Sequence, residues 1–501
     1  MTCVLGLDIG TTSTTGALIR LPDRAIGFAS RPVWLRSARV GWAEEDPEQW
    51  WTNVREIVRE LLNKSGAAAE VAAVGVSGML PAVVLLDRND VLLRPSIQQS
   101  DARCAAEVAE LRSEIEESAF LAKAGNGINQ QLVAPKLRWI ERHEPEVFAR
   151  IGTVFGSYDY VNWKLAGERA IEQNWALEAG FVDLATHAID DALVALSHAP
   201  RAVVPRKTRS HEILGPVSKI AAAETGLAAG TPVVGGAADM VASALGAGVV
   251  ASGDVLLKFG GAVDILLAAD HAKPDRRLYL DYHLIPGLFA PNGCMATGGS
   301  ALNWFARNFA GGEIAAAEKA GLPLHQWLDH LADARPASSE GLVVTPYFLG
   351  EKTPIHDPGA RATFDGLTLS HDIGHVWRAM LEAYAYAIAH HVEVMNEIGY
   401  RTERFIASDG GSSSRVWMQI VADVLQQPVQ RLAGQPGSCI GAAWTAAVGA
   451  GLADWAGISA IVRPADRIDP RREFAGIYAD GYRRYREIYR RLAETREPNA
   501  R

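Results

Sequence analysis

Cysteine is scarce in this sequence, with four residues in 501. Cys3, Cys104, Cys294 and Cys439 are scattered along the chain, and none lies in a CxxC pair. Paired or regularly spaced cysteines are what a disulfide framework or a cysteine zinc site requires. The sequence therefore predicts neither.

Excess positive charge and long apolar runs are also lacking. Lys and Arg number 49 against 58 Asp and Glu, a net charge of -9, which disfavours a surface for nucleic acid or anionic membrane. The longest weakly polar run, residues 240–252, is too short for a membrane span. The N-terminus has no basic region followed by an apolar one. We therefore expect a cytoplasmic protein with no nucleic-acid or membrane partner, which binds a small ligand through local groups.

Two common nucleotide motifs are absent, since the chain has neither GxxxxGK[ST] nor a GxGxxG turn after its first strand. Residues 4–18 instead predict a buried strand, a polar turn and a second strand. The turn holds Gly10, Thr11, Thr12 and Ser13. Its backbone N–H groups and hydroxyls suit phosphate oxygens, and Asp8 at the strand end suits Mg²⁺. An ordinary hairpin with a polar tip is the alternative.

The same strand-and-turn pattern returns twice. Residues 253–262 repeat a strand followed by Gly260-Gly261-Ala262, and residues 405–415 form a third strand followed by a glycine-rich turn with Gly410 and Gly411. A chain of 501 residues is too long for one core and indicates two domains, with three as the alternative. The repeats favour two related halves.

Two acidic positions stand out beside predicted strands. Asp239 follows a buried strand at 233–234 and opens a helix of small residues, so it is either a helix N-cap or a carboxylate that faces a ligand. Asp101 and Arg103 lie just before a helix that starts near Cys104. This pair suits either the hydroxyls of a polyol or a solvated salt bridge.

The order of these pieces resembles the FGGY carbohydrate kinases of the actin-like ATPase superfamily. The run 230–239 is the decisive match, and residues 362–382 fit the second signature of that family throughout. Residues 134–140 resemble the first signature at Lys136 and Trp139. In the stretch 171–174 the usual Thr-Asp-x-Ser is replaced.

The resemblance implies an α/β fold of two actin-like (ribonuclease H-like) domains, each a mixed β-sheet flanked by helices, with the active site in a cleft between them. The expected division is 1–246 for sugar and phosphate binding, 247–480 for nucleotide binding, and 481–501 for a C-terminal helix and tail. It further implies transfer of the γ-phosphate of ATP to a terminal hydroxyl of a sugar, with ATP and Mg²⁺ required, and a homodimer.

The family also implies a role for each matching residue. Asp239 is the catalytic base and Asp8 the magnesium ligand. The phosphate contacts are Gly10, Thr11, Thr12, Ser13, Gly260 and Gly261, and the remaining nucleotide contacts are Gly299, Asn303, Gly410, Gly411, Ser412 and Arg415. The sugar contacts are Leu80, Pro81, Gln99, Asp101, Arg103 and Asp239.

Departures from the family pattern bear on the substrate. Overall likeness is greatest to xylulokinases, which indicates a ketose, most simply a pentulose such as D-xylulose. Yet Pro81 stands where those enzymes carry a histidine, Gln99 replaces an aromatic residue, and Gly261 replaces the usual threonine of the second turn. Another ketose, a polyol or a sugar acid is the alternative, with glycerol disfavoured. An actin-like ATPase or a pseudokinase that acts as a sensor is the alternative of another class.

Overall fold

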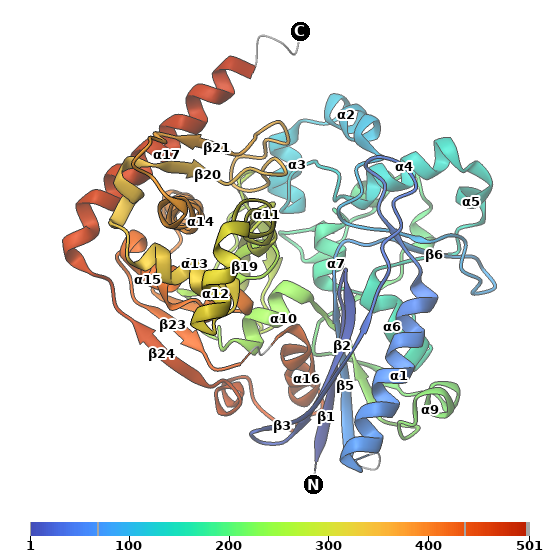
Figure 1. Cartoon of the computed structure of the whole chain (residues 1–501). Coiled ribbons are helices and arrows are strands. Elements are labelled where there is room, and N and C mark those ends of the chain that lie inside the picture. The colour runs from blue at the N-terminus through green and yellow to red at the C-terminus, as the bar shows by residue number, and fades with distance from the viewer. Residues whose placement is uncertain (1, 68–69, 435–436, 497–501) are drawn as a thin grey trace. The chain divides into compact units, whose positions relative to one another are not determined.

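The computed structural model describes residues 2–67, 70–434 and 437–496. Packing divides the chain into two compact units, and each contains a mixed β-sheet with helices against it (Figure 1). Unit 1 consists of Met1–Val250, Asp270–Pro291 and Pro436–Val462, and unit 2 of Ala251–Ala269, Asn292–Gln435 and Arg463–Arg501. The predicted α/β class is confirmed. The units are interleaved in sequence, which the contiguous division expected above does not include.

The sheet of unit 1 has the strand order β13-β14-β5-β1-β2-β3, and β15 pairs with β5. β1 is antiparallel to β2 and parallel to β5, so the predicted hairpin is confirmed, although β1 continues past Asp8 to Ile9. The strands are β1 (Cys3–Ile9), β2 (Ser13–Arg20), β3 (Arg24–Pro32), β5 (Val71–Gly78), β13 (Ile213–Pro216), β14 (Pro232–Val234) and β15 (Ala237–Ala238).

Helix α1 (Pro47–Ser65) covers one face of this sheet. Asp46 before Pro47 is typical of a helix start, and Asp46 is the N-cap, whose side chain accepts a hydrogen bond from the Glu48 N–H at 3.0 Å. Gly16 of β2 lies beneath the helix, where a Cβ would be 2.5 Å from Ile57. The helix therefore rests directly on the strand.

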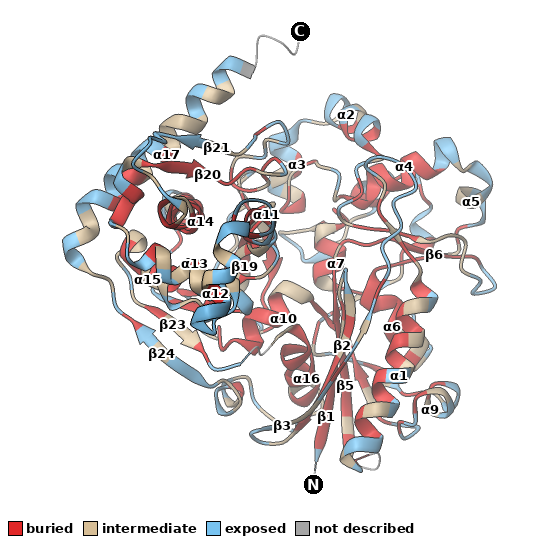
Figure 2. Cartoon of the chain, in the orientation of Figure 1, coloured by how far each residue is buried: buried red, intermediate tan, exposed pale blue. Residues whose placement is uncertain are grey.

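The opposite face is covered by α16 (Gly437–Gly449), which comes from late in the sequence. A Cβ on Gly6 of β1 would lie 1.8 Å from the Cys439 carbonyl oxygen, and one on Gly75 of β5 would lie 2.2 Å from that of Ala442. Only glycine allows backbones to approach this closely. In Figure 2, α16, β1 and β5 are coloured as buried almost throughout. This helix of small residues therefore lies in the core of unit 1.

Two asparagines hold β18 (Tyr279–Tyr282) in unit 1. The Asn126 side chain accepts from the Leu280 N–H and donates to its carbonyl oxygen, both at 2.9 Å. Asn174 makes the same pair of bonds with Tyr282, at 2.7 and 3.0 Å. These two strand residues are two apart, so both bond pairs lie along one edge of the strand. This pinning explains why residues 270–291 pack with unit 1.

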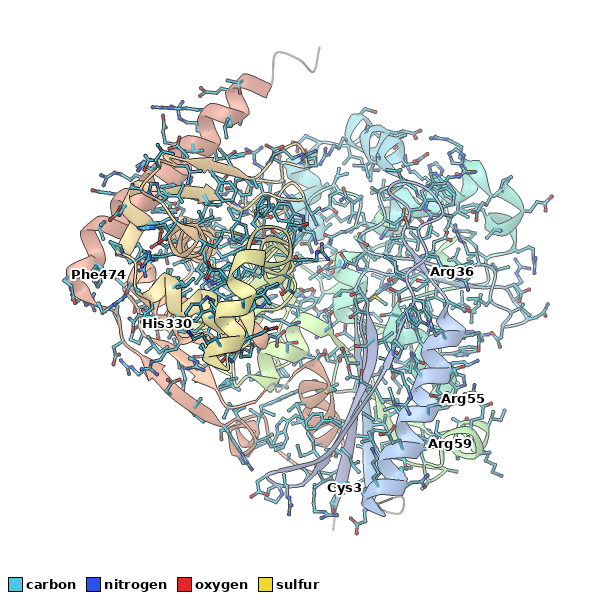
Figure 3. All side chains as sticks on the ribbon, in the orientation of Figure 1. Cys3, Arg36, Arg55, Arg59, His330 and Phe474 are labelled. Atoms are coloured by element: carbon cyan, nitrogen blue, oxygen red, sulfur yellow. The ribbon has the colours of Figure 1, made fainter. Side chains whose placement is uncertain are left out.

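Helix α1 also contacts α9. Figure 3 labels Arg55 and Arg59 on α1, and the Arg59 guanidinium donates to the Ala223 carbonyl of α9 at 3.5 Å.

The remaining elements of unit 1 are short. These elements are β4 (Glu44–Glu45), β6 (Val84–Leu86), β7 (Ser96–Ile97), α2 (Ala105–Glu114), α3 (Glu117–Ala124), α4 (Val133–His143), α5 (Pro145–Arg150), β8 (Thr153–Phe155), α6 (Ser157–Ala166), β9 (Ala170–Glu172), α7 (Gln173–Glu178), β10 (Val182–Asp183), β11 (Ala188–Ile189), α8 (Asp191–Ala195), β12 (Arg206–Thr208), α9 (Lys219–Thr225) and α10 (Asp239–Gly246).

The sheet of unit 2 repeats the plan of unit 1. Its order is β19-β17-β16-β22-β23-β24, and β16 is antiparallel to β17 and parallel to β22, as β1 is to β2 and β5. The predicted second strand-and-turn pattern is thus confirmed. The strands are β16 (Asp254–Phe259), β17 (Val263–Leu267), β19 (Phe289–Cys294), β22 (Arg404–Ser408), β23 (Val429–Leu432) and β24 (Pro464–Ile468).

The longest helix of unit 2 that the structure describes is α14 (Ile373–Ile398). α17 (Ala475–Arg496) carries charge outward but buries Tyr478 and Tyr485. Residues 494–496, expected to fray, are helical, and 497–501 lie outside the described residues. The other elements are α11 (Gly299–Phe309), α12 (Ile314–Ala320), α13 (Leu324–Asp333), β20 (Val343–Thr345), β21 (Thr363–Asp365) and α15 (Arg415–Leu425).

Among residues 2–67, 70–434 and 437–496, the helices fall short of the length and apolar character that crossing a membrane requires.

Candidate active site

Asp8 and Asp239 lie at the same edge of the sheet in unit 1. Asp8 pairs with Ser77 across β1 and β5, and Ser77 pairs with Ala237 of β15. Asp239 follows two residues later, directly after β15. Because β1, β5 and β15 are parallel, both carboxylates stand at the carboxyl ends of strands, where α/β sheets bind ligands.

Asp239 is the first residue of α10, and Ala238 occupies the N-cap position. The N-cap interpretation of Asp239 is therefore wrong. Its Oδ1 accepts a hydrogen bond from the Met240 N–H at 2.7 Å, and the residue is half-buried. A carboxylate held at a helix start beside a strand edge has the placement that a general base needs.

The glycines before Asp239 are tightly packed against neighbouring backbone. A Cβ on Gly235 would lie 2.2 Å from the Arg209 carbonyl oxygen, and one on Gly236 would lie 2.6 Å from that of Val76. Gly236 also has φ of +99°, which favours glycine. These residues serve the close packing of backbone that positions Asp239.

The first polar turn joins β1 to β2 and is open on its outer side. Gly10 N–H donates to the Ser13 carbonyl at 3.1 Å and closes the turn. Thr11 and Thr12 are exposed and Ser13 is half-buried. Ser77 Oγ donates to Asp8 Oδ1 at 2.7 Å. The structure thus brings Asp8 and the hydroxyls of the turn together, as predicted.

A metal ion at Asp8 would have to take most of its ligands from elsewhere. No group of three or more His, Cys, Asp and Glu that could hold a metal occurs in the part of the chain that the structure describes. Mg²⁺ in phosphate-transfer sites uses one or two carboxylates and completes its shell with water and phosphate oxygens. A single carboxylate fits that mode.

The second polar turn, in unit 2, is joined to the start of α11. Gly299 N–H donates to the Gly260 carbonyl and Ser300 N–H to the Gly261 carbonyl, both at 3.0 Å. Ser300 Oγ also donates to the Gly261 carbonyl at 2.7 Å. The structure therefore unites Gly260, Gly261 and Gly299 as predicted. It adds Ser300, a hydroxyl that sequence reasoning missed, although the residue directly follows Gly299.

Lys258 occupies the position in unit 2 that Asp8 occupies in unit 1. Asp8 lies two residues before Gly10 and pairs with Ser77 of the parallel neighbour strand, while Lys258 lies two residues before Gly260 and pairs with Ser408. Burial raises the pKa of nearby Asp409, and the charge of Lys258 opposes that rise. The equivalent places beside the two turns thus carry opposite charges.

The third turn follows β22 and contains the 3₁₀ segment Gly410–Ser413. A Cβ on Gly411 would lie 2.7 Å from the Trp417 ring and 2.8 Å from the Cβ of Phe259, so that side of Gly411 is filled by packing. Ser412 is buried and donates to the Asp409 carbonyl at 2.7 Å.

The remaining predicted nucleotide contacts of unit 2 are exposed. Gly410 and Asn303 lie on the surface, the latter on α11. The exposed Arg415 forms an ion pair with Asp466.

A buried lysine, Lys136, binds the backbone of the loop that contains Leu80 and Pro81. Lys136 Nζ donates to the Pro81 carbonyl at 3.0 Å and to the Gln131 carbonyl at 3.3 Å. Burial lowers the pKa of Lys136 to about 8. Gln131 also donates to Gln99 Oε1 at 3.4 Å. Leu80 and Gln99 are half-buried and Pro81 is buried, so Lys136 fixes two loops that carry predicted sugar contacts.

Asp101 and Arg103 form an ion pair whose two side chains have no exposed surface. Asp101 Oδ2 accepts from the Ala43 N–H at 2.6 Å and from Arg103 at 2.7 Å. Arg103 also pairs with Glu44 at 2.8 Å and lies 3.8 Å from the Trp42 ring centroid. The solvated salt bridge is therefore wrong. A direct polyol contact is not supported either, because the bonding groups face protein; the pair braces the loop that presents Gln99.

The altered stretch 171–174 is also structural. Glu172 caps α7 through the Asn174 N–H at 2.8 Å and accepts from Tyr158 at 2.9 Å and Ser210 at 2.7 Å. Burial raises the pKa of Glu172 to about 7. The departure from the family pattern thus sits in a fully bonded internal network.

Comparison with known proteins covers most of the chain. Residues 3–246 match the model of the N-terminal domain of the FGGY family of carbohydrate kinases, and residues 265–450 match that of its C-terminal domain. The chain is 29% identical to the xylulose kinase of Escherichia coli (strain K12) over 449 residues, 89% of this chain and 90% of that protein. It is 26% identical to the gluconokinase of Bacillus subtilis (strain 168) over 442 residues, 88% and 86% of the two chains.

A solved structure is more similar still. The crystal structure of xylulose kinase from Rhodospirillum rubrum superimposes with a TM-score of 0.92 and 55% sequence identity, covering 98% of this chain and 99% of the other. Both units of the present fold are therefore represented in that structure.

Proposed function

Because the chain belongs to the FGGY family of carbohydrate kinases, we propose that it transfers the γ-phosphate of ATP to a terminal hydroxyl of a ketose, most simply a pentulose such as D-xylulose. The observation that carries the proposal is the 55% identity, over nearly the whole of both chains, to a structure described as a xylulose kinase. The paired carboxylates at the edge of the unit 1 sheet support the reaction class.

Asp239 acts as the general base. It takes the proton from the sugar hydroxyl as that oxygen attacks the γ-phosphorus, and its place at the start of α10 fixes the direction from which the proton leaves. The half-buried carboxylate accepts a hydrogen bond at Oδ1 from the Met240 N–H, which orients the group. A positioned base of this kind contributes about 10²- to 10⁴-fold to the rate.

Each polar turn binds phosphate oxygens. In unit 1, Thr11, Thr12 and Ser13 supply hydroxyls, and in unit 2 the backbone of Gly260 and Gly261 supplies N–H groups. Lys258 supplies positive charge beside the turn that lacks the usual threonine. Asp8 holds Mg²⁺, which when bound offsets the charge of the phosphate oxygens.

Adenosine lies against the third turn, on Gly410, Gly411 and Ser412. The start of α11 with Gly299 and Asn303, and Arg415 of α15, complete this part of unit 2. The filled side of Gly411 supports a fixed turn, because Trp417 and Phe259 hold its backbone from behind. The opposite side is the one we assign to the nucleotide.

The sugar contacts Leu80, Pro81 and Gln99, and its reacting hydroxyl contacts Asp239. The histidine usual in xylulokinases is missing at 81, and the aromatic residue usual at 99 is Gln99, so one polar contact and one aromatic contact that would select the sugar are changed. A site that binds a hydroxyl discriminates strongly against analogues without it. We therefore propose a broader preference among ketoses, and the similarity to a gluconokinase favours sugar acids as the second candidate substrates.

We further propose that the enzyme acts in the cytoplasm as a homodimer. Light scattering on a sizing column tests the assembly, with a mass of twice 53.8 kDa expected and a mass of one chain as the contrary result.

Coupled ADP release with Mg-ATP tests the reaction against pentuloses, hexuloses, polyols and sugar acids. We expect a pentulose to raise turnover far above basal hydrolysis, and Asp239→Asn to lower kcat by about 10²- to 10⁴-fold with an unchanged melting temperature. Stimulation by a sugar acid alone would select the second substrate class. Stimulation by none of the compounds would favour the sensor or pseudokinase, and full activity of the variant would remove Asp239 as the base.

A further inference from the structure

A cavity of about 390 Å³ lies within unit 1 and contains none of the predicted site residues. Small-molecule sites typically have volumes of about 300–1,000 Å³, so the cavity is large enough for a small ligand. One wall comes from the segment that begins with β12, and the other from the loop between β18 and β19. The lining residues are Gln173, Thr186, His187, Lys207, Arg209, His211, Tyr282, His283, Leu284, Pro286, Gly287, Leu288 and Phe289.

The lining is basic and contains no Asp or Glu. Lys207 and Arg209 lie two residues apart and so emerge on the same side of an extended segment. Neither side chain has a hydrogen bond or ion pair with a residue in 2–67, 70–434 or 437–496. Their neighbour Arg206, which does not line the cavity, pairs instead with Glu212 at 3.9 Å.

Nearby carboxylates are already engaged. Glu212 accepts from Thr208 Oγ1 at 3.2 Å. Asp183 caps a turn by accepting from the Ala185 N–H at 2.8 Å. Glu172 is enclosed by the bonds of its own network. The two cations of the cavity are therefore left for a negative group that enters it.

The facing wall is aromatic and apolar. Tyr282 donates or accepts a hydrogen bond with His187 Nδ1 at 2.9 Å, and its ring centroid lies 5.7 Å from that of Phe289. Asn174 fixes the backbone of Tyr282 by two bonds, so this wall is held in place before any ligand arrives. Leu284, Pro286 and Leu288 extend it.

We propose that this cavity binds a small organic anion, namely a phosphate ester or a carboxylate on a compact body. Lys207 and Arg209 bind the anionic group, and the wall of Tyr282 and Phe289 contacts the body. Two cations without a hydrogen bond or ion pair of their own on one side, and apolar surface on the other, are complementary to such a molecule. Glu172 and Glu212 act on Lys207 through their charge alone. The site uses none of the residues assigned to sugar or nucleotide, so the proposal does not depend on the kinase reaction.

Isothermal titration calorimetry tests the proposal with ribose 5-phosphate, gluconate, inorganic phosphate and neutral ribose, in the presence of saturating Mg-ADP. We expect at least one of the two organic anions to bind and ribose not to bind. Lys207→Met and Arg209→Met should each weaken binding at least tenfold, whereas Arg206→Met, which removes the same charge from the next residue, should change it less than twofold. Binding of ribose 5-phosphate that Lys207→Met removes assigns the cavity to phosphate esters, and binding of gluconate that Lys207→Met removes assigns it to carboxylates, because gluconate held at the sugar site would still bind to this variant.

Acetylation with mass spectrometry locates the bound anion in the wild-type protein. The anion should protect Lys207 and leave the exposed Lys219 of α9 unprotected. Absence of binding by both organic anions, equal affinity in all the variants, or acetylation of Lys207 unaffected by the anion would each overturn the proposal.

Discussion

Asp8 and Lys258 show how one structural position can carry opposite chemistry in two related halves. Each lies two residues before the first glycine of a polar turn and beside a serine of the neighbouring parallel strand. A carboxylate there suits a magnesium ion, whereas an ammonium there suits phosphate oxygens directly. In the proposed reaction we expect the charge of Lys258 to offset the hydroxyl that is missing from the second turn.

Restoring that hydroxyl should raise activity. A Cβ on Gly261 would meet no heavy atom within 4 Å, and its φ is not among the positive ones, so Gly261→Thr fits without strain. A hydrogen bond to a charged acceptor contributes about 1.5–3 kcal/mol, so kcat/KM for ATP should rise by about 10- to 100-fold. Steady-state kinetics measure this, with Gly261→Val as the control of equal shape; a gain in the valine variant would show that the hydroxyl is not the cause.

Removing the charge of Lys258 should weaken ATP binding. We expect Lys258→Met to raise KM for ATP by about tenfold with a smaller change in kcat, because a phosphate contact made before and during transfer acts uniformly. Lys258→Arg keeps the charge and should stay within about threefold of the wild type. Equal kinetics for the methionine variant would place Lys258 outside the phosphate site.

Among the elements, those with strong local signals were predictable. The β1–β2 hairpin and the cap of α1 follow from alternating apolar residues and from Asp46 before Pro47. The burial of Asp101 and Arg103 was not predictable, because it depends on Trp42, far away in sequence, which covers the guanidinium. The place of α16 depends in turn on Gly6 and Gly75, which read locally as ordinary strand residues.

In the candidate site, too, features with a local sequence signal were predictable and features that depend on distant residues were not. The edge that carries Asp8 and Asp239 was predictable, since both residues follow buried strands. The position of Ser77 at this edge was also predictable, because Ser77 directly follows the apolar run at 71–76. The support of Pro81 by Lys136 was not, because a buried lysine that bonds to carbonyls has no local pattern.

One buried carboxylate makes stability depend on pH at the junction of β4 and α1. Glu45 has no exposed surface, and burial raises its pKa to about 7, against the hydrogen bond from Trp50 Nε1. The folded state therefore binds the proton more tightly than the unfolded state. The stability that this group contributes is present below about pH 4.5 and is lost as the pH rises through about 7.

Glu45→Gln should remove this loss. At 1.36 kcal/mol per pKa unit, we expect the variant to be more stable than the wild type by up to about 3 kcal/mol at pH 8, and nearly equal to it at pH 5. Urea unfolding at both pH values measures the difference.

Glu48→Gln provides the matched control on α1. Burial raises the pKa of Glu48, but hydrogen bonds from Tyr160 and Lys164 outweigh it and lower the pKa on balance, so this variant should lose stability at pH 8. A Glu45 variant that gains equally at pH 5 and pH 8 would contradict the assignment of the raised pKa.

At the scale of the whole molecule, nucleotide binding should be visible as added stability. A ligand at 100 times its Kd raises the free energy of unfolding by about 2.7 kcal/mol, so Mg-ADP should raise the melting temperature above that with ADP alone. We expect Asp8→Asn to abolish the part of the increase that needs Mg²⁺, and Asp23→Asn, at an exposed turn, to keep it. An unchanged increase in the Asp8 variant would place the ion elsewhere.

The position of α16 also fixes the order in which the chain can mature during synthesis. Residues 1–250 leave the ribosome with the glycine-lined face of β1 and β5 uncovered, and the helix that covers this face, α16, is complete only at Gly449. At about 5–20 residues per second this is an interval of roughly 10–40 s. Throughout that interval the nascent first half presents an unsealed apolar surface, which makes it a natural client for chaperones that act on growing chains.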